Sequence, residues 1–487
     1  MSIKTRADYL SALKKMRPNV YKFGELIEDV TTHPATKQTV ESHAMCFDAA
    51  NDPDLAKMYT TKSMFSEEPI LRWNSMMQSI GDLVQNMKFK RQNYRRSGTC
   101  TGGACVGWNA QNVMWAVTQE MDKELKTDYQ ARLKKWILFA QEEGLTVAGA
   151  LTDAKGDRSK SPSQQEYQGS NVHIKEVRED GVVISGVKAM ICGTAASQEI
   201  FILPGGFYKE ADKDFAFACV IPKDIEGLTI VEARHASDKR EFEKNADVEI
   251  PSTGITQGWL LFDDVLVPHD RVFMCGEYKY SGKVIQYFTA NYRACIGGCV
   301  TGQGDVMVGA SVLMARANGL SSKPFMGKLV DMSVHNQVTF GLGAGAIALG
   351  NQHESGSFFA DGITAHTNKV MVATLPYEVK RLTQDIGGGI VETGCLPSFE
   401  DFQNPEYGPT LQKSLKAGAC SYESRYKATR LSEWLTLGGG VPGCMHGGGS
   451  PDGAKMVVRA LTPFEQYADY ARNIIGIEEE IKEPEKK

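Results

Sequence analysis

The stretch GVVISGVKAMICGT, residues 181–194, is dominated by β-branched and small residues and ends in a glycine turn. Short runs of the same kind surround it, separated by Gly, Pro, Asp and Asn: EIFILPGG, FAFACVIP, LTIVEAR and GWLLFDDVLVP. Runs of this length, rich in β-branched and aromatic residues and bounded by turn residues, are typical of strands. We therefore predict a compact β domain over residues 146–275.

Both flanks of this domain have a helical pattern instead. Before it, PILRWNSMMQSIGDLVQNMKFKRQN and AQNVMWAVTQEMDKELKTDYQARLKKWILFAQEEG space apolar residues three and four apart, and the second run stops at a glycine. After it, DVMVGASVLMARANGL, KPFMGKLVDMSVHNQVTFGLGAGAIALGNQ and TNKVMVATLPYEVKRLTQDIGGG repeat that spacing. The sequence predicts an α+β chain with an N-terminal helical domain (1–145), the β domain, and a C-terminal helical domain (276–487) with a solvated charged tail.

Composition narrows the class of protein. The chain has 487 residues, of which 42% are hydrophobic and 23% charged, so it can bury a core. Its 54 basic and 59 acidic residues give a net charge of −5, which disfavours binding to nucleic acid or an anionic membrane. The sequence shows no signal-peptide pattern and no apolar stretch near the roughly 18 residues that span a bilayer. With eleven scattered cysteines, we expect a cytoplasmic protein with reduced thiols.

Four cysteines lie in two glycine-rich stretches. Cys100 and Cys105 belong to SGTCTGGACVGWNAQNV, and Cys295 and Cys299 belong to NYRACIGGCVTGQGD. On a helix, residues 292, 295 and 299 share one face. Thiolates suit zinc or iron–sulfur clusters, although these are not zinc-ribbon spacings. Cysteines are also often buried without any ligand role, so both interpretations stay open.

Four loops are candidates for binding a phosphate or a planar ring. The polar segment 151–165 is turn-prone, and 188–197 ends a strand at Gly193, where a ring can approach the backbone. The glycine-rich turns 384–394 and 446–456 can offer backbone N–H groups to a pyrophosphate. None is a G-x-G-x-x-G motif after a strand, so a Rossmann site is not predicted.

Five motifs occur in a familiar order: LTDAKGDRSKSPS, LFDDVLVPHDRVFM, GGCVTGQGDV, PYEVKRLTQDIGGG and HGGGSP. In this combination the chain resembles the 4-hydroxybutyryl-CoA dehydratase family and, more distantly, the flavin-dependent 4-hydroxyphenylacetate 3-hydroxylases. The resemblance runs nearly end to end. It implies the acyl-CoA dehydrogenase fold, a homotetramer, FAD at the subunit interfaces and an acyl-CoA thioester as substrate.

The same resemblance implies the positions that bind FAD. They lie in the loop after the first helical block, in the turn at the end of the 181–194 strand, and in the two glycine turns. The first glycine turn resembles the one with which acyl-CoA dehydrogenases hold a neighbouring subunit's FAD. The implied residues are Thr152, Lys155, Asp157, Arg158, Cys192, Gly193, Thr194, Gln384, Gly387, Gly388, His446, Gly447 and Ser450.

The family also carries a [4Fe–4S] cluster, held by three cysteines and one histidine, and here the chain departs from it. Cys105 and Cys299 match two of the cysteine positions, but Thr101 stands at the third and Tyr292 replaces the histidine. Either the cluster is lost and the thiols pack, or it is retained on four thiolates. The four-thiolate site would consist of Cys100, Cys105, Cys295 and Cys299.

Proton-handling groups are missing as well. Gln257 stands where the family has a carboxylate, and a family glutamate is replaced near Gly443. Hydroxide is a poor leaving group without a general acid. We therefore expect a lyase, with Tyr292 and Gln257 in its site, that eliminates ammonia or trimethylamine rather than water from C4 of a butyryl-CoA thioester, as from γ-butyrobetainyl-CoA, giving a crotonyl-CoA-type product. The aromatic face of Tyr292 suits a quaternary cation.

Three alternatives remain. The chain is a 4-hydroxybutyryl-CoA dehydratase and vinylacetyl-CoA isomerase proper, with the Tyr292 hydroxyl as the acid, or it is a flavin-dependent aromatic hydroxylase, which needs no cluster. The third is a non-catalytic or electron-carrying flavo-iron–sulfur protein, which absence of CoA-ester binding would favour.

Overall fold

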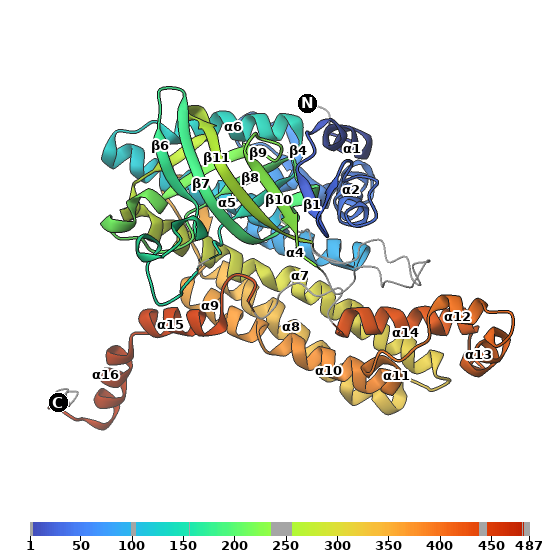
Figure 1. The fold of residues 1–487 in the computed structure, drawn as a ribbon. Helices are drawn as coiled ribbons and strands as arrows, with labels where there is room; N and C mark the ends of the chain where they lie inside the picture. The colour runs from blue at the N-terminus through green and yellow to red at the C-terminus, as the bar shows by residue number, and fades with distance from the viewer. Residues whose placement is uncertain are drawn as a thin grey trace.

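The computed structural model describes residues 3–98, 104–154, 156–234, 256–437, 446–479 and 481. Helices come first along the chain, strands follow, and helices return from residue 281 (Figure 1), so the α+β class expected from the sequence is confirmed. The N-terminal helices are α1 (Arg6–Lys15), α2 (Lys37–Asn51), α3 (Ala56–Tyr59), α4 (Ile80–Ser97), α5 (Ala104–Leu125) and α6 (Tyr129–Glu143).

Two sheets form the centre of the chain. One has six strands in the order β2-β1-β10-β11-β7-β6, and the other has four in the order β12-β9-β8-β5. Their bounds are β1 Val20–Lys22, β2 Glu25–Ile27, β5 Val147–Ala150, β6 His173–Val177, β7 Gly181–Cys192, β8 Glu199–Ile202, β9 Phe217–Pro222, β10 Leu228–Glu232, β11 Gln257–Pro268 and β12 Val272–Cys275. A separate hairpin joins β3 (Thr60–Lys62) to β4 (Pro69–Leu71).

The C-terminal region is built on two long helices, α7 (Ser281–Ala317) and α8 (Met326–Ala348). A small hairpin, β13 (Asn351–Gln352) and β14 (Phe358–Phe359), follows α8. The remaining helices are α9 (Gly362–Val372), α10 (Leu375–Gly387), α11 (Gly389–Glu392), α12 (Phe399–Gln403), α13 (Gly408–Leu415), α14 (Tyr422–Thr436), α15 (Pro451–Leu461) and α16 (Phe464–Ile475).

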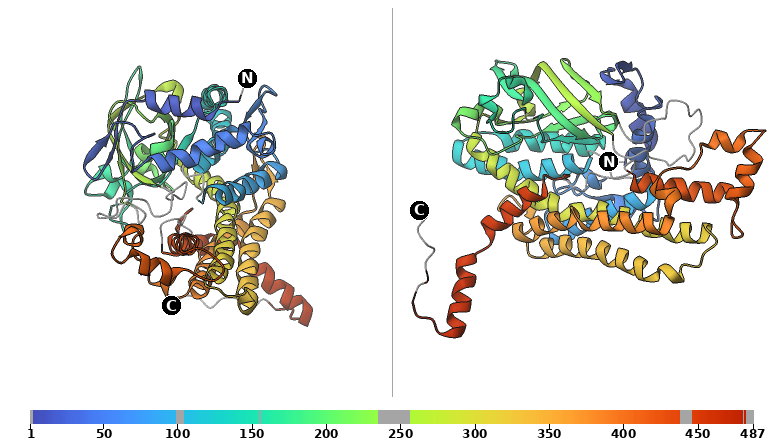
Figure 2. Two further views of the ribbon diagram at one scale, coloured as in Figure 1. Left: turned by 90° about the vertical axis from the view of Figure 1, so that its right-hand side faces the viewer. Right: turned by 60° about the horizontal axis from the view of Figure 1, so that its bottom comes forward.

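Helix α5 joins the β domain to the C-terminal helices, because it packs on β5 and on α7, and α4 packs on α7 as well (Figure 2). Glycines on α7 allow the close approach of α4. A Cβ at Gly298 would lie 2.5 Å from the Met87 carbonyl oxygen, and one at Gly302 would lie 2.7 Å from that of Arg91. The glycine-rich stretch after Cys295 is therefore a helix-packing surface, which places α4 side chains directly against α7.

Some local expectations change in the structure. The helix expected from residue 69 begins only at Ile80, where the Ser79 hydroxyl accepts the backbone N–H of Asp82 as an N-cap. The helical pattern over 367–389 is two helices, because Pro376 stands in the first turn of α10 and cannot continue α9. The domain limits at 146 and 275 stay predictions, and the first sheet takes β1 and β2 from before that range.

Two apolar surfaces stand apart from the core. Helix α16 extends away from the body (Figure 1) and buries none of its residues. The second surface is a groove along α7 and α8, lined by valines that include Val308, Val312, Val330 and Val334. Within the described residues no helix is both long and apolar enough to cross a membrane. The cytoplasmic location and the solvated tail stay predictions, and most of the tail lies outside the described residues.

Candidate active site

Tyr292 lies on α7 and is enclosed by three parts of the chain. Its ring stacks on Phe288 with a centroid distance of 5.3 Å. The Lys90 ammonium, from α4, lies 5.7 Å from the centre of the same ring. The turn before α15 closes the third side, since a Cβ at Gly448 would lie 2.8 Å from Tyr292 Cδ1. We call these residues, with the adjoining Arg293, the Tyr292 site.

Lys90 is an unusual lysine because only 4% of it is exposed. No carboxylate among the described residues lies within ion-pair distance of its ammonium, whose recorded neighbours are the Tyr292 ring and the thiol of Cys295. Burial raises the pKa of Cys295 to about 11, and the Lys90 charge opposes that rise. The stem of Lys90 packs against Gly298, where a Cβ would lie 3.1 Å from its own.

Arg293 is a second buried cation in the same place. It is 6% exposed, and its Nε donates to the Gly448 carbonyl oxygen at 2.9 Å. Its Nη1 is buried and has no hydrogen-bond partner among the described residues. Burial lowers the pKa of Arg293 to about 10, so the guanidinium stays charged at neutral pH. A Cβ at Gly449 would lie 2.8 Å from Nη2, so this position, with a φ of +93°, calls for glycine.

His366 lies on α9, which packs on α7, the helix of Arg293. Its Nδ1 is 2.6 Å from the Gly362 carbonyl oxygen. Because a carbonyl can only accept, Nδ1 carries the proton and Nε2 is left as an acceptor. Burial and the Arg293 charge lower the pKa of His366 to about 4, against the smaller effects of Gly362 and Asp361. The imidazole is therefore neutral at physiological pH.

The end of β7 carries the predicted turn. Gly193 is left-handed, with a φ of +68°, and Gln257 Nε2 donates to Cys192 Sγ at 3.6 Å. Thr194 donates its hydroxyl to Glu232 Oε1 at 3.2 Å. Burial raises the pKa of Glu232, whose side chain lies on the inner face of the sheet. Sequence analysis missed this carboxyl, although its inward position in LTIVEAR was a signal.

The loop after β5 lies against β7. The Thr152 carbonyl accepts the backbone N–H of Ala189 at 3.0 Å. Asp157 is tied within the loop, its carboxylate accepting the Ser159 hydroxyl at 2.7 Å, and Arg158 is exposed. Lys155 lies outside the described residues. The structure thus brings the predicted loop and the predicted turn together along one strand.

The two glycine turns lie apart in one chain. Gln384, Gly387 and Gly388 are at the end of α10, on the far side of the C-terminal region from the β domain (Figure 1). The second turn, with His446, Gly447 and Ser450, instead lies against the Tyr292 site, and the Ser450 hydroxyl caps α15 by accepting the Gly453 N–H. Of the two glycine turns, the second therefore contacts the Tyr292 site of its own chain, and the first does not.

The predicted cysteine site is only partly described. Cys295 Sγ lies 3.9 Å from the Leu83 carbonyl oxygen, and Cys299 Sγ lies 3.4 Å from that of Ile296. Cys105, at the start of α5, is buried, whereas Cys100 lies outside the described residues. Within the part of the chain that the structure describes, no three His, Cys, Asp or Glu side chains form a metal-binding group. The four-cysteine cluster stays a prediction.

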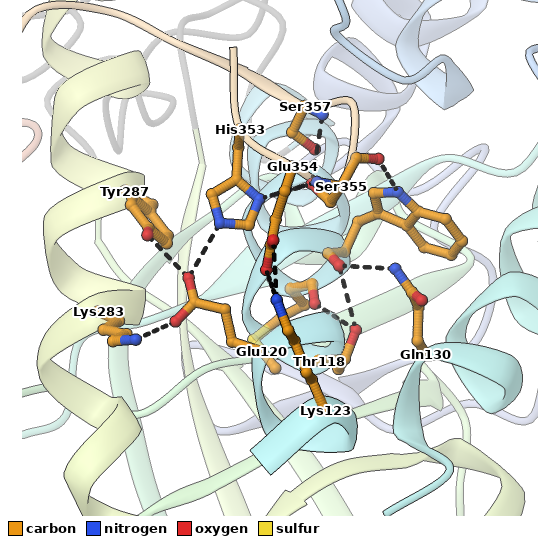
Figure 3. Close-up of polar contacts among 12 residues, drawn as sticks. Thr118, Glu120, Lys123, Gln130, Lys283, Tyr287, His353, Glu354, Ser355 and Ser357 are labelled. Carbon is orange, nitrogen blue, oxygen red and sulfur yellow. Dashed lines mark hydrogen bonds and ion pairs between the residues drawn. The ribbon is translucent and has the colours of Figure 1, made fainter. Parts of the chain in front are cut away.

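A polar cluster fixes the start of α7 (Figure 3). Glu120, from α5, accepts hydrogen bonds from Tyr287 at 2.8 Å and from His353 Nε2 at 3.1 Å, and pairs with Lys283. Tyr287 also stacks on Phe359 with ring centroids 4.4 Å apart. These contacts tie the β13–β14 hairpin to α7 one turn before Tyr292. No sequence pattern indicated this cluster, because its members come from distant segments.

Comparisons with known proteins agree with this architecture. Two family models match, described as 4-hydroxyphenylacetate 3-hydroxylase N terminal over residues 5–274 and C terminal over residues 281–476. The solved FAD complex of the oxygenase HpaB is similar in fold, with a TM-score of 0.83 at 22% identity over 97% of this chain and 98% of that one. The chain thus has the fold of the acyl-CoA dehydrogenase type, with N-terminal helices, two central sheets and long C-terminal helices, which is a fold found in enzymes.

Two similarities are stronger. The chain is 33% identical to the 4-hydroxybutyryl-CoA dehydratase/vinylacetyl-CoA-Δ-isomerase of Clostridium aminobutyricum, over 97% of this chain and 99% of that protein. An oxygen-tolerant archaeal 4-hydroxybutyryl-CoA dehydratase from N. maritimus has a TM-score of 0.94 at 33% identity, covering 100% of this chain and 97% of that one. The chain belongs to the 4-hydroxybutyryl-CoA dehydratase family, as its motifs predicted.

Proposed function

We propose that this chain is a FAD-dependent lyase that eliminates a C4 substituent from a 4-substituted butyryl-CoA thioester, giving a crotonyl-CoA-type product. Its family membership supports the thioester and the reaction type. The observation that carries the proposal is the buried ammonium of Lys90 over the Tyr292 ring. It places a proton donor in a site where the family's proton-handling groups have been replaced.

The positive charge of the Tyr292 site favours a hydroxyl leaving group over a cationic amine. An ammonium or trimethylammonium group would enter beside Lys90 and Arg293, both buried and without a carboxylate partner among the described residues. A like charge about 6 Å away costs about 3 kcal/mol at an effective dielectric constant of about 20. We therefore place a hydroxyl leaving group ahead of the amine that the sequence favoured.

Lys90 performs the step that hydroxide loss requires. Its ammonium gives a proton to the C4 oxygen as the C–O bond breaks with the electron pair on oxygen, so water leaves and Lys90 becomes neutral. The electron pair of a Cβ–H bond, whose proton passes to a base, forms the Cβ–C4 double bond, and a later shift of that double bond gives the crotonyl-type product. Tyr292 forms the wall opposite Phe288 and keeps this proton transfer away from bulk water. Gln257 lies at the start of β11 against Cys192, and its amide orients groups without exchanging protons.

The residues present fit FAD. Met190, at a φ of +60°, and Trp259 are exposed on neighbouring strands beside the 192–194 turn, and such an apolar surface next to polar backbone suits a planar ring. Thr152, Asp157, Arg158 and the 192–194 turn would hold it in one subunit, and Gln384 to Gly388 in a neighbouring one. FAD supplies the electron chemistry that makes an unactivated C–H bond acidic.

A homotetramer is part of the proposal. The valine-lined groove on α7 and α8 and the uncovered α16 offer apolar surface to other subunits. The separation of the two predicted FAD-binding halves within one chain also favours an interface site. Size-exclusion chromatography with light scattering measures the assembly directly.

The test uses FAD-loaded enzyme, purified without oxygen, with 4-hydroxybutyryl-CoA, 4-aminobutyryl-CoA and γ-butyrobetainyl-CoA as separate substrates. We expect mass spectrometry to show a crotonyl-CoA-type product, formed fastest from the hydroxy thioester. Lys90→Met should slow water loss by 10²-fold or more. Lys88→Met, on the exposed face of the same helix, is the matched control. Product from none of the three thioesters would refute the lyase, and faster amine release would restore the sequence-based order.

The aromatic hydroxylase is the second candidate, favoured by the two family-model matches. It predicts oxygen-dependent hydroxylation of a phenol by the enzyme with chemically reduced FAD. We expect no hydroxylated product in that assay.

A further inference from the structure

The Nη1 group of Arg293 is a buried donor with no acceptor among the described residues. Leaving such a group unsatisfied costs about 1–3 kcal/mol, and more when it is charged. Nε donates to the Gly448 carbonyl oxygen, and the absence of a side chain at Gly449 leaves room for Nη2. The guanidinium is therefore held in place with one end unsatisfied, next to Tyr292.

His366 is near enough to Arg293 for the guanidinium charge to be one of the causes that lower the pKa of its imidazole. It is 3% exposed, and the bond from Nδ1 to Gly362 fixes its ring with Nε2 as an acceptor. Asn368, half a turn further along α9, donates to the Arg293 carbonyl oxygen at 2.9 Å, which locks α9 to α7 at this point. The neutral base His366 and the cation Arg293, which has no carboxylate partner among the described residues, thus lie on two helices that are bonded to each other at this point.

We propose that Arg293 and His366 act as a pair on the thioester: Arg293 Nη1 binds the acyl carbonyl oxygen, and His366 Nε2 removes a proton from the neighbouring Cα. The thioester itself rests on the proposed function above. In this step the Cα–H bond breaks, the proton moves to Nε2, and the electron pair is delocalised onto the carbonyl oxygen. No electron leaves the substrate, so the step needs no oxidant or reductant.

The charges around His366 make this assignment reasonable. Arg293 disfavours a protonated imidazole, and Asp361 at the start of α9 favours one. As negative charge develops on the carbonyl oxygen, it offsets the guanidinium charge, so His366 becomes a stronger base during the proton transfer itself. Interactions that strengthen in the transition state are those that accelerate a reaction.

Glu232 is a weaker candidate for the same role. Its carboxyl lies on the inner face of the β sheet and accepts the Thr194 hydroxyl, within the β domain. Arg293 instead lies on α7, the helix that carries Tyr292, and His366 lies on α9, which packs on α7.

The experiment follows exchange of the Cα protons of butyryl-CoA in D₂O by mass spectrometry. Butyryl-CoA has no C4 leaving group, so exchange is independent of elimination. We expect wild-type holoenzyme to exchange these protons and His366→Gln to lose at least 10²-fold in rate, with the Kd for butyryl-CoA changed less than threefold. Arg293→Gln should raise the Kd and slow exchange, and Arg293→Lys should recover part of both.

Matched controls are His269→Gln and Arg178→Gln, which change the same residue types on the surface of the β domain. Circular dichroism and the flavin absorbance of each variant report folding and FAD content. The rate of exchange in wild type should rise with pH as His366 loses its proton, and His366→Gln should lose this dependence.

The outcomes separate the two proposals. Exchange without any elimination supports the pair and refutes the lyase. Elimination by wild type, together with unchanged exchange in a folded His366→Gln, refutes the pair and leaves the lyase standing. Absence of exchange in wild type that binds butyryl-CoA also overturns the pair.

Discussion

Two places in this molecule bury a cation, and they treat it in opposite ways. In the β domain, Lys188 and Asp153 form an ion pair of 2.8 Å, with side chains 2% and 3% exposed. Lys188 also donates to the carbonyl oxygens of Leu151 and Leu203. In the Tyr292 site, Lys90 and Arg293 have no carboxylate among the described residues. A fully paired cation serves the fold, and an unpaired one is available to a ligand.

The largest effect is expected from breaking the paired site. Asp153→Ala leaves Lys188 buried without its carboxylate, and removal of one member of a buried pair costs about 3–5 kcal/mol of unfolding free energy. Urea unfolding measures the loss. Lys175→Ala is the control, because its pair with Asp264 is about half exposed and should be worth less than about 1 kcal/mol. Equal losses in both variants would erase the distinction between the two kinds of pair.

Lowering the pH should reduce the stability of the chain through His366, next to the unpaired Arg293. The pKa of His366 is lowered to about 4 in the folded chain. The folded state therefore binds this proton less readily, so the stability contribution is complete above about pH 6.5 and is lost as the pH falls towards 4. We expect a loss of about 1–2 kcal/mol, since solvent screening reduces the full linkage value. His366→Gln should flatten this part of the stability profile, and Arg293→Met should shift it to higher pH.

The Glu120 cluster is a second paired site, nearer the surface. Glu120→Gln weakens the bonds to Lys283, Tyr287 and His353, and we expect a loss of about 1 kcal/mol. Hydrogen exchange should quicken in the 351–359 hairpin. Glu354→Gln, which removes only an exposed partner of Lys123, should leave that exchange unchanged.

The smallest effect is expected at Lys90. Lys90→Met removes a buried charge that has no counter-charge to lose, so the FAD-free chain should keep its stability or gain about 1 kcal/mol. Thermal unfolding of the FAD-free protein measures this. A loss of stability as large as that of Asp153→Ala would show that Lys90 has a structural partner, and would contradict its assignment as an unpaired cation.

The sequence was most informative where local pattern and packing agree. Strand β11 forms where the run GWLLFDDVLVP predicted a strand, and α6 ends at Gly144, in the left-handed conformation, where a glycine stop was predicted. The pairing of β1 with β10 was not predictable, because it joins Val20 to Ile230 across about 210 residues. Register over such a separation depends on tertiary packing rather than on local propensity.

The residues of the Tyr292 site likewise divide into those that the sequence could predict and those that it could not. Tyr292 and the 446–450 turn could be selected from motifs, and the structure brings them into contact. Lys90, Arg293 and His366 carry no such signal, because a lysine or histidine in an amphipathic helix reads as an exposed residue until its neighbours are known. Their importance follows from burial and from the absence of carboxylate partners in the described part of the chain, which are properties of the folded state alone.

The unsatisfied nitrogen of Arg293 also bears on how long the protein survives in a cell. A chain that gains stability only when its ligand supplies the missing acceptor is more often unfolded when that ligand is scarce. Quality-control proteases remove unfolded chains, and a difference of about 1–2 kcal/mol changes abundance several-fold. Supply of the proposed thioester ligand would then affect the amount of enzyme present as well as the rate at which each molecule works.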